Sequence, residues 1–305
     1  MRAIRFHTYG DPGVLRLEEV DRPVPEAGQV LLQVAGTSFN PVDAAFRAGY
    51  MQQAIPISLP HIPGFDVAGT VVNATGATAG DAVIGFLPMT SPGAAAEFTL
   101  APTEVLTAAP STIPLADAAA VPAVALTAWQ GLFEHVDLRA GQRILINGAG
   151  GGVGGYAVQF AKQAGATVLA TAGPRSTAAV RAAGADQIVD YTATTVTDAI
   201  DEPVDAVFNL VVADEAAMAG LVALIRPGGV LVSTASPAPE DTERKVRTMN
   251  MYVRSDATQL AEIVRRIDAG TVTVDISARH PLAEVALVHE LSAAGTIRGK
   301  VVITV

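Results

Sequence analysis

The chain has 305 residues, half of them hydrophobic and 16% charged, which is enough for two well-packed domains and too apolar for a disordered protein. Its formal net charge of −10 and the lack of any basic stripe argue against a surface for nucleic acid or an anionic membrane. Because it contains no cysteine, disulfides, thiolate nucleophiles and cysteine-ligated metals are excluded.

The N-terminal stretch, MRAIRFHTYGDPG, lacks the uninterrupted apolar core of a signal peptide. We find no later stretch that approaches the roughly 20 consecutive apolar residues of a membrane span. These two observations predict a cytoplasmic protein without a membrane partner.

The first 120 residues contain short apolar or alternating runs, such as 29–34 and 67–73, which are broken by Pro and Gly. Such a texture is typical of antiparallel strands joined by turns. We expect a mainly β domain here.

After residue 120 the pattern changes to apolar strand-like runs separated by Ala-rich helical stretches. The predicted strands are 143–147, 167–171, 187–190, 205–210 and 230–234. The RPGG sequence at 226–229 is expected to end the preceding helical stretch before the last of these strands. Repeated β-α units of this length predict an α/β fold with a doubly wound parallel sheet.

The remaining C-terminal segment predicts two further helices and two further strands. The helices are expected at 256–270 and 281–295, and the strands at 271–276 and 300–305.

Six glycines lie between Gly148 and Tyr156, after a predicted strand and before a predicted helix at 153–164. In that position a glycine turn lets backbone N–H groups at a helix N-terminus receive a pyrophosphate. The G-x-G-x-x-G spacing fits Gly150, Gly152 and Gly155, and the related A-x-G-x-x-G spacing fits Ala149, Gly151 and Gly154 equally well. Counting alone does not choose between the two registers, and a glycine turn without a ligand is the alternative.

The end of the next strand carries no acid: the first one after it is Asp186, whereas Arg175 and Ser176 follow the strand directly. A carboxylate there binds the ribose hydroxyls of NAD, whereas a 2′-phosphate needs a cation. Arg175 also stands near the start of a predicted helix, where the helix dipole disfavours a cation unless an anion is bound. The sequence therefore favours NADPH over NADH; a solvated surface arginine is the alternative.

Seven stretches resemble the zinc-free quinone oxidoreductases, the zeta-crystallin-like branch of the medium-chain dehydrogenase/reductase superfamily. They cover essentially the whole chain in the family's order: SFNPVDAAFRAGY (38–50), IPGFDVAGTVV (62–72), PAVALTAWQGL (122–132), GAGGGVGGYAVQFAKQAGATV (148–168), GADQIVDY (184–191), RPGGVLV (226–232) and IRGKVVITV (297–305). The resemblance implies a GroES-like, mainly β catalytic domain over 1–122, completed by 255–305, and a Rossmann NADPH-binding domain over 123–254. It also implies the glycine register that uses Ala149, Gly151 and Gly154.

The same resemblance addresses the metal. The catalytic zinc ligands of the zinc-dependent relatives correspond here to Asn40, Phe65 and Ala123, none of which is an anionic or imidazole ligand. The five histidines show no H-x-x-x-H spacing, so we expect no metal site. Without a Lewis acid, reduction of a conjugated acceptor is easier than alcohol oxidation, because the acceptor spreads the developing charge.

The resemblance further implies the site residues. Asn40, Asp43 and Thr127 would line the nicotinamide end, and Tyr50 is the nearest phenol because Ala44 and Ala45 stand where relatives often carry a tyrosine. The residues expected to bind cofactor are Thr127, Ala149, Gly151, Gly152, Val153, Gly154, Arg175, Ser176, Tyr191 and Lys300. Asn40 and Asp43 as helix caps, and Tyr191 as a packing residue, are the alternatives.

Three functions follow, in order of preference. The first is an NADPH-dependent, metal-free reductase of a quinone or related conjugated carbonyl. The second is an enoyl reductase acting on a polyketide-like α,β-unsaturated substrate. The third is a non-catalytic, crystallin-like nucleotide-binding protein.

A homodimer is expected through an edge strand at 249–253, which includes Met251 and Tyr252. This apolar run would be the last strand of the parallel sheet, and it contains no Lys or Pro to protect the edge. Pairing with the same strand of a second copy would satisfy both edges and bury Met251 or Tyr252.

Overall fold

In the computed structural model, which describes residues 1–74 and 78–305, the chain divides into two units. The first, called here the β-rich unit, comprises residues 1–123 and 255–305. The second, the α/β unit, comprises residues 124–254. The C-terminal segment therefore belongs to the same unit as the N-terminal third of the chain.

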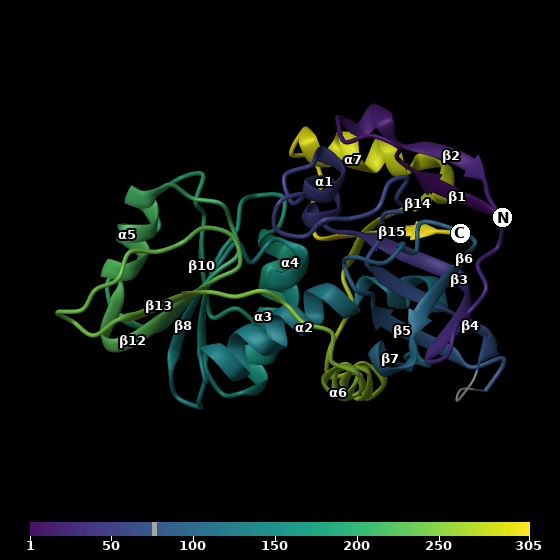
Figure 1. Ribbon diagram of the computed structural model, residues 1–305. Coiled ribbons are helices and arrows are strands. Elements are labelled where there is room, and N and C mark those ends of the chain that lie inside the picture. Colours follow the sequence, from purple (N-terminus) through teal and green to yellow (C-terminus); the bar gives the residue numbers. More distant parts are fainter. Residues whose placement is uncertain (75–77) are drawn as a thin grey trace. The chain divides into compact units, whose positions relative to one another are not determined.

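The β-rich unit is built on one sheet in the order β14-β15-β3-β4-β5-β7, with β6 also paired to β3 (Figure 1). The strands are β3 (Gln29–Phe39), β4 (Asp66–Ala74), β5 (Ala82–Phe86), β6 (Phe98–Pro102), β7 (Leu106–Ala108), β14 (Ile276–Pro281) and β15 (Lys300–Thr304). A separate hairpin joins β1 (Arg2–Arg5) to β2 (Arg16–Glu19). All pairs are antiparallel except β14 with β15, which confirms the predicted mainly β domain.

The α-helices in the described part of this unit are α1 (Pro41–Ala48), α6 (Ala257–Asp268) and α7 (Val285–Ala293). Short 3-10 turns cover Pro12–Val14, Thr103–Val105, Leu115–Ala120 and Leu282–Glu284. Helix α6 lies within the predicted helix at 256–270 and buries Leu260, Ile263, Val264 and Ile267, the spacing of one helix face. The Asp256 carboxylate accepts the Gln259 N–H and so caps its start.

The α/β unit contains a fully parallel six-stranded sheet in the order β10-β9-β8-β11-β12-β13. Its strands are β8 (Arg143–Asn147), β9 (Thr167–Thr171), β10 (Gln187–Val189), β11 (Val204–Asn209), β12 (Ile225–Ser233) and β13 (Arg247–Asn250). Its helices are α3 (Gly152–Gln163), α4 (Thr177–Ala182) and α5 (Glu215–Ala223); α2 (Pro122–Gln130) begins at the unit boundary and continues as a π-helix over Gly131–His135. Counted within the unit, the order is 3-2-1-4-5-6, the doubly wound arrangement that binds dinucleotides beside its first strand.

Two local predictions were wrong. The RPGG residues do not precede a strand but bulge out of β12, because Val204 pairs with Ile225 and Ala206 with Val230. Arg226 forms an ion pair with Asp205, and any side chain at Gly229 would meet the Asp205 carbonyl oxygen.

The predicted strand at 271–276 is absent over most of its length, since β14 begins only at Ile276. The N–H groups of Thr271 and Val272 both donate to the Arg266 carbonyl at 3.0 and 3.2 Å. These bonds close the end of α6 and hold the chain out of strand geometry.

The expectation about apolar length also needs correction. The helical stretch Leu115–His135 is long and apolar enough to span a membrane, although 83% of its most apolar window is buried inside the protein. A core helix satisfies the same length and composition test as a membrane helix.

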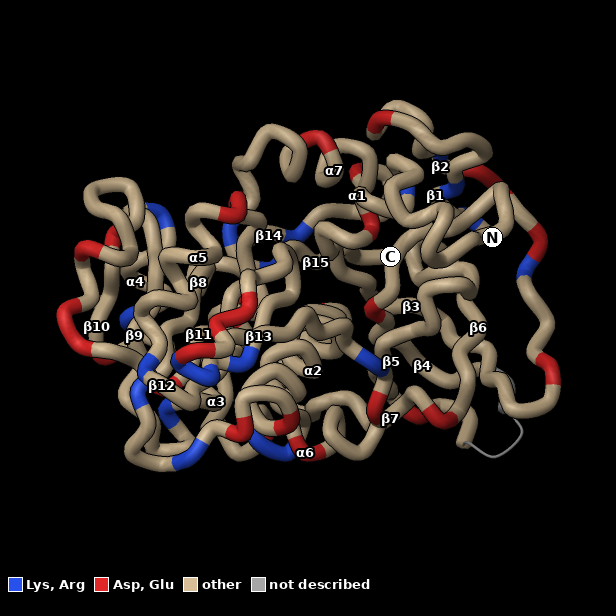
Figure 2. The backbone as a smooth tube through the Cα atoms, turned by 60° about the vertical axis from the view of Figure 1, so that its left-hand side comes forward, with Lys and Arg blue, Asp and Glu red and all other residues tan. Residues whose placement is uncertain are grey.

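Figure 2 shows the basic residues dispersed along the chain among acidic ones, and several are paired, such as Arg254 with Glu134.

Candidate functional site

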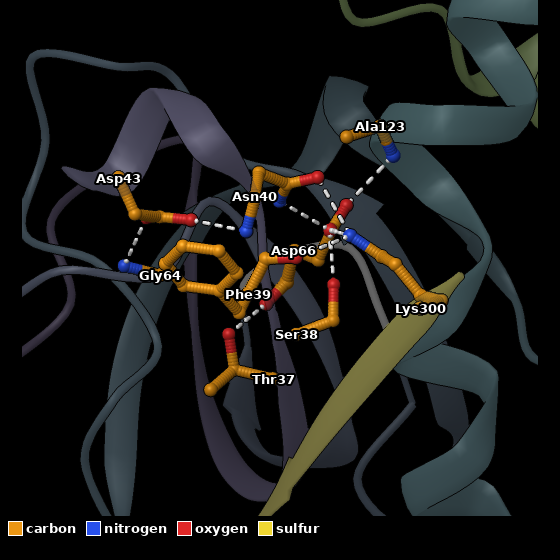
Figure 3. Close-up of polar contacts among 9 residues, drawn as sticks. All are labelled: Thr37, Ser38, Phe39, Asn40, Asp43, Gly64, Asp66, Ala123 and Lys300. Carbon is orange, nitrogen blue, oxygen red and sulfur yellow. Dashed lines mark hydrogen bonds and ion pairs between the residues drawn. The ribbon is translucent and has the colours of Figure 1, made fainter. Parts of the chain in front are cut away.

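The predicted residues Asn40 and Lys300 meet because of strand register. Val301 of β15 pairs with Phe39 at the end of β3, which puts Lys300 beside Asn40. On the other side of β3, β4 begins at Asp66 and runs antiparallel to it. The ends of three strands thus bring together residues that are far apart in sequence (Figure 3).

The centre of this cluster is Asp66, whose side chain is fully buried. Its Oδ1 accepts the Ala123 N–H at 2.7 Å. Its Oδ2 accepts bonds from the Ser38 hydroxyl, the Asn40 Nδ2 at 2.8 Å and the Lys300 Nζ at 3.1 Å. Four donors occupy about as many lone-pair positions as an ionised carboxylate offers, so the buried charge is compensated.

Lys300 is 3% exposed and uses all three of its N–H groups. Nζ donates to the Phe39 carbonyl at 3.1 Å, to Asn40 Oδ1 at 2.6 Å and to Asp66 Oδ2 at 3.1 Å. No N–H of this ammonium is left for a cofactor phosphate, although Lys300 was expected among the cofactor residues. Its position favours a role beside Asn40 instead.

Asp43 lies next to the cluster, buried at 2% exposure. Its Oδ2 accepts the Asn40 N–H at 2.8 Å and its Oδ1 accepts the Gly64 N–H at 3.0 Å. Burial raises the pKa of Asp43 to about 7, although both backbone bonds and the Lys300 charge oppose that rise. Asp43 therefore caps α1, as the alternative had it, and can also gain or lose a proton near neutral pH.

Tyr50 is not brought to this cluster. It follows the left-handed Gly49 that ends α1, and its side chain is 84% exposed. Tyr50 was the phenol expected nearest to Asn40, but in the described residues it makes no hydrogen bond to the cluster.

The glycine turn follows β8 and leads into α3. Gly148 has a φ of +94°, a backbone conformation that residues with a side chain rarely adopt, and Gly151 is the N-cap of α3. The first N–H groups of the helix, on Gly152, Val153 and Gly154, have no carbonyl within the helix to bond to. A Cβ at Gly154 would lie under 3.0 Å from backbone atoms of Ala149, so this glycine allows close packing of helix on turn.

The loop after β9 lies against this turn. A Cβ at Gly150 would overlap the Ser176 side chain, and one at Gly173 would lie 3.2 Å from the Tyr191 hydroxyl. Ser176 is buried and its hydroxyl donates to the Gly173 carbonyl at 3.2 Å, whereas Tyr191 is 58% exposed. The structure thus groups Ser176 and Tyr191 with the turn.

Two further predicted residues belong to the α/β unit. Arg175 is exposed in the loop between β9 and α4, next to Ser176. Thr127 lies in α2 and is 8% exposed. The glycine turn and the first N–H groups of α3 fit the pyrophosphate of a nicotinamide dinucleotide.

No group of three His, Cys, Asp or Glu side chains within residues 1–74 and 78–305 is placed to hold a metal ion. The three positions that the sequence resemblance matches to the zinc ligands of zinc-dependent relatives make other contacts in this structure. Asn40 bonds to Lys300 and Asp66, Ala123 donates its N–H to Asp66, and Phe65 packs on Phe46 with ring centroids 5.2 Å apart.

Sequence reasoning missed Asp66 and Ser38 as members of this site. The signal for Asp66 was present: it is a lone carboxylate inside the apolar run of residues 62–72. A charged residue in a strand that is otherwise apolar needs a buried partner.

Comparisons with known proteins agree with this architecture. The family models that match are the alcohol dehydrogenase GroES-like domain, over residues 26–111, and the zinc-binding dehydrogenase model, over residues 183–303. The chain is 32% identical to the chloroplast envelope quinone oxidoreductase homolog of Arabidopsis thaliana, over 99% of this chain and 98% of that protein. It is 33% identical to the NADPH-dependent alkenal/one oxidoreductase of the same plant, over 99% of this chain and 79% of that protein.

Among solved structures, the quinone oxidoreductase from Coxiella burnetii superposes with a TM-score of 0.90 at 28% identity, covering 100% of this chain and 99% of that one. A doubly wound dinucleotide sheet combined with a GroES-like unit defines a nicotinamide-dependent oxidoreductase. Because the 32% identity extends over nearly the full length of both chains, the chain belongs to the medium-chain dehydrogenase/reductase superfamily, in its zinc-free quinone oxidoreductase branch.

Proposed function

We propose that this protein is an NADPH-dependent reductase that transfers hydride to a quinone or a related conjugated carbonyl without a metal. The observation that carries the proposal is the Asn40 amide, which hydrogen bonds to Lys300 and Asp66 hold in place. The sequence resemblance matches Asn40 to a metal ligand of the zinc-dependent relatives. Relatives named for quinone and alkenal/one reduction support this substrate class.

When bound, NADPH supplies the hydride, and the conjugated acceptor spreads the resulting charge over an enolate or phenolate. The chain's own residues then have two tasks. Asn40 offers an amide N–H to the acceptor oxygen, where a donor placed in advance stabilises the developing charge. Burial raises the pKa of Asp43 to about 7, so this carboxyl can take up or release a proton close to Asn40 near neutral pH.

For the cofactor we propose that the turn residues Ala149, Gly151, Gly152, Val153 and Gly154 hold the pyrophosphate through backbone N–H groups. Arg175, Ser176 and Tyr191 would surround the ribose phosphate, and Thr127 the nicotinamide end. As a catalytic residue, Tyr50 would have to move its exposed ring toward Asn40 when substrate binds. The cytoplasmic location is a prediction from the sequence.

The proposed function is tested by steady-state NADPH consumption with a panel of acceptors: a benzoquinone, a simple enone, an enoyl thioester and a saturated aldehyde. We expect turnover of the quinone and the enone and none of the aldehyde, because only conjugation delocalises the product charge. Turnover of the enoyl thioester alone would indicate an enoyl reductase, and turnover of no acceptor would contradict an enzymatic role.

Arg175→Ala is expected to raise the Michaelis constant for NADPH about 10- to 100-fold more than that for NADH. The change removes a charge-assisted bond to the 2′-phosphate, which NADH lacks, and such a bond is worth roughly 1.5–3 kcal/mol. Both constants are measured in parent and variant under the same conditions.

The matched control is Arg181→Ala, which removes an exposed arginine from the last turn of α4. We expect it to leave the cofactor preference unchanged. If Arg175→Ala discriminates between NADPH and NADH as the parent does, Arg175 is not a phosphate ligand.

We also propose a homodimer through β13, the terminal strand of the parallel sheet. The edge strand was expected at 249–253, but β13 covers Arg247–Asn250, so Met251 and Tyr252 follow the strand rather than belong to it. Met249 in β13 is 37% exposed, and Tyr252 beyond its end is 82% exposed. Met251, expected as a contact residue, is instead buried, and its N–H donates to Ser233 within the chain at 2.8 Å. Because N–H directions alternate along a strand, Thr248 and Asn250 direct their N–H groups outward.

Light scattering should therefore give about twice the chain mass of 31.2 kDa. Asn250→Pro, which removes an outward donor, should shift the mass toward the monomer while the melting temperature stays close to that of the parent. A monomeric parent at micromolar concentration, or a dimer that tolerates Asn250→Pro, would rule this interface out.

A further inference from the structure

The Asn40 side chain is fixed at both ends of its amide group. Its Oδ1 accepts the short bond from the Lys300 ammonium, at 2.6 Å, and its Nδ2 donates to the Asp66 carboxylate at 2.8 Å (Figure 3). Rotating the amide by half a turn would set an NH2 group against an ammonium and an oxygen against a carboxylate. The ion pair between Lys300 and Asp66 therefore allows one amide orientation only.

An amide nitrogen carries two N–H groups, and Asp66 takes one of them. Among residues 1–74 and 78–305 the second N–H has no acceptor, so it can serve a ligand, and its direction is fixed by the same two contacts. The positive charge of the Lys300 ammonium, which donates to Oδ1, also polarises the amide and strengthens its N–H groups as donors in a low-dielectric interior.

The cluster costs free energy to build, which a purely structural role does not explain well. Lys300 and Asp66 are 3% and 0% exposed, and moving two charges from water into the interior carries a desolvation penalty. A pair of apolar side chains in the same place is often equally stable. The cost of burying the Lys300 and Asp66 charges is explained if the two charges orient another group, here the Asn40 amide.

We propose that Lys300 and Asp66 are positioning residues for the reductase reaction: together they orient and polarise the Asn40 amide so that its second N–H meets the acceptor oxygen as negative charge develops there. The proposal rests on the proposed function, in which Asn40 contacts the acceptor. It assigns Lys300, expected at the cofactor, to the acceptor side of the reaction.

Removing one partner alone would leave an uncompensated buried charge and unfold the protein more easily, so the test uses a neutral pair. In the double variant Asp66→Asn/Lys300→Met both charges are absent, and circular dichroism should show a melting temperature within a few degrees of the parent. We expect kcat to fall about 10- to 100-fold, as for a misplaced catalytic group, with the Michaelis constant for NADPH within about twofold of the parent value.

Coupling to Asn40 separates positioning from an independent effect. Asn40→Ala should lower kcat about as much as the double variant does, and combining all three changes should lower it no further. The matched control is Asp117→Asn/Arg279→Met, which removes another ion pair of the β-rich unit, with contacts of 2.7 and 2.8 Å and no bond to Asn40. It should leave kcat unchanged.

A second readout needs no turnover. In ¹⁵N spectra of the parent, the Asn40 side-chain amide protons should exchange slowly with solvent, and in the double variant about tenfold faster or more. A double variant with parental kcat, losses that multiply with Asn40→Ala, or an unchanged amide spectrum would each overturn the inference while leaving the proposed function intact. If the parent reduces no acceptor, the proposed function and the catalytic role both fail, and the spectrum still decides whether the pair orients Asn40.

Discussion

Gly154→Ala is expected to destabilise the protein by about 1–3 kcal/mol or more and to weaken NADPH binding strongly. The added Cβ would lie under 3.0 Å from the Cα, C and O atoms of Ala149, which are backbone atoms and cannot rotate away. Either α3 or the glycine turn must shift, and overpacking of this kind costs that much free energy. The shift would displace the helix N–H groups that we propose bind the pyrophosphate.

The next residue offers a matched control. A Cβ at Gly155 would meet no atom within 4 Å, and Gly155 lies in the same helix without a positive φ. Gly155→Ala should therefore raise stability by up to about 1 kcal/mol, because alanine favours a helix more than glycine does. Urea unfolding and NADPH titration of both variants measure the difference. Equal effects of the two substitutions would show that the close contact at Gly154 is unimportant.

Asp43→Asn is expected to change how stability depends on pH. The unfolded carboxyl titrates near its ordinary pKa of 3.8 and the folded one at about 7, so between these values the folded protein holds a proton that the unfolded chain has lost. In the parent, this group makes the free energy of unfolding fall as pH rises from 4 to 7, by about 1.4 kcal/mol per pH unit, or roughly 4 kcal/mol in all. Below pH 4 both states are protonated and the contribution is fully present.

The variant removes this titration, so the difference in stability between variant and parent should shift in the variant's favour by that amount between pH 4 and 7. Any misfit of the new amide against the Asn40 and Gly64 N–H groups adds a constant offset and no slope. Comparison with the parent is needed because burial lowers the pKa of His61 to about 4 and of His289 to about 3, which makes stability fall toward acid pH instead. Urea unfolding from pH 4 to 8 checks the slope.

The control for this second experiment is Asp190→Asn. Asp190 is a surface residue, and hydrogen bonds from Thr192 lower its pKa, so its replacement should not favour the variant as pH rises. A stability difference between Asp43→Asn and parent that stays constant from pH 4 to 7 would mean that Asp43 titrates normally in the folded protein.

The sequence by itself determined the elements whose signals are local. The strands at 143–147 and 167–171 coincide with β8 and β9 to the residue, because a buried parallel strand is an unbroken apolar run flanked by turn residues. The glycine turn, the helix after it and the missing acid near Arg175 were likewise visible within about 30 residues. Such signals need no knowledge of what packs against them.

Only the tertiary structure decided what depends on distant partners. Spacing fitted two glycine registers equally well, and only the folded turn shows that a Cβ at Gly154 would meet the Ala149 backbone whereas one at Gly155 would meet no atom within 4 Å. Lys300 was expected at the cofactor, but its ammonium bonds to Asn40, 260 positions away, and to Asp66, 234 positions away. A buried charge needs a partner, and the register of the paired strands decides which residue lies beside it. That register depends on strands far apart in the sequence, so no local pattern shows it.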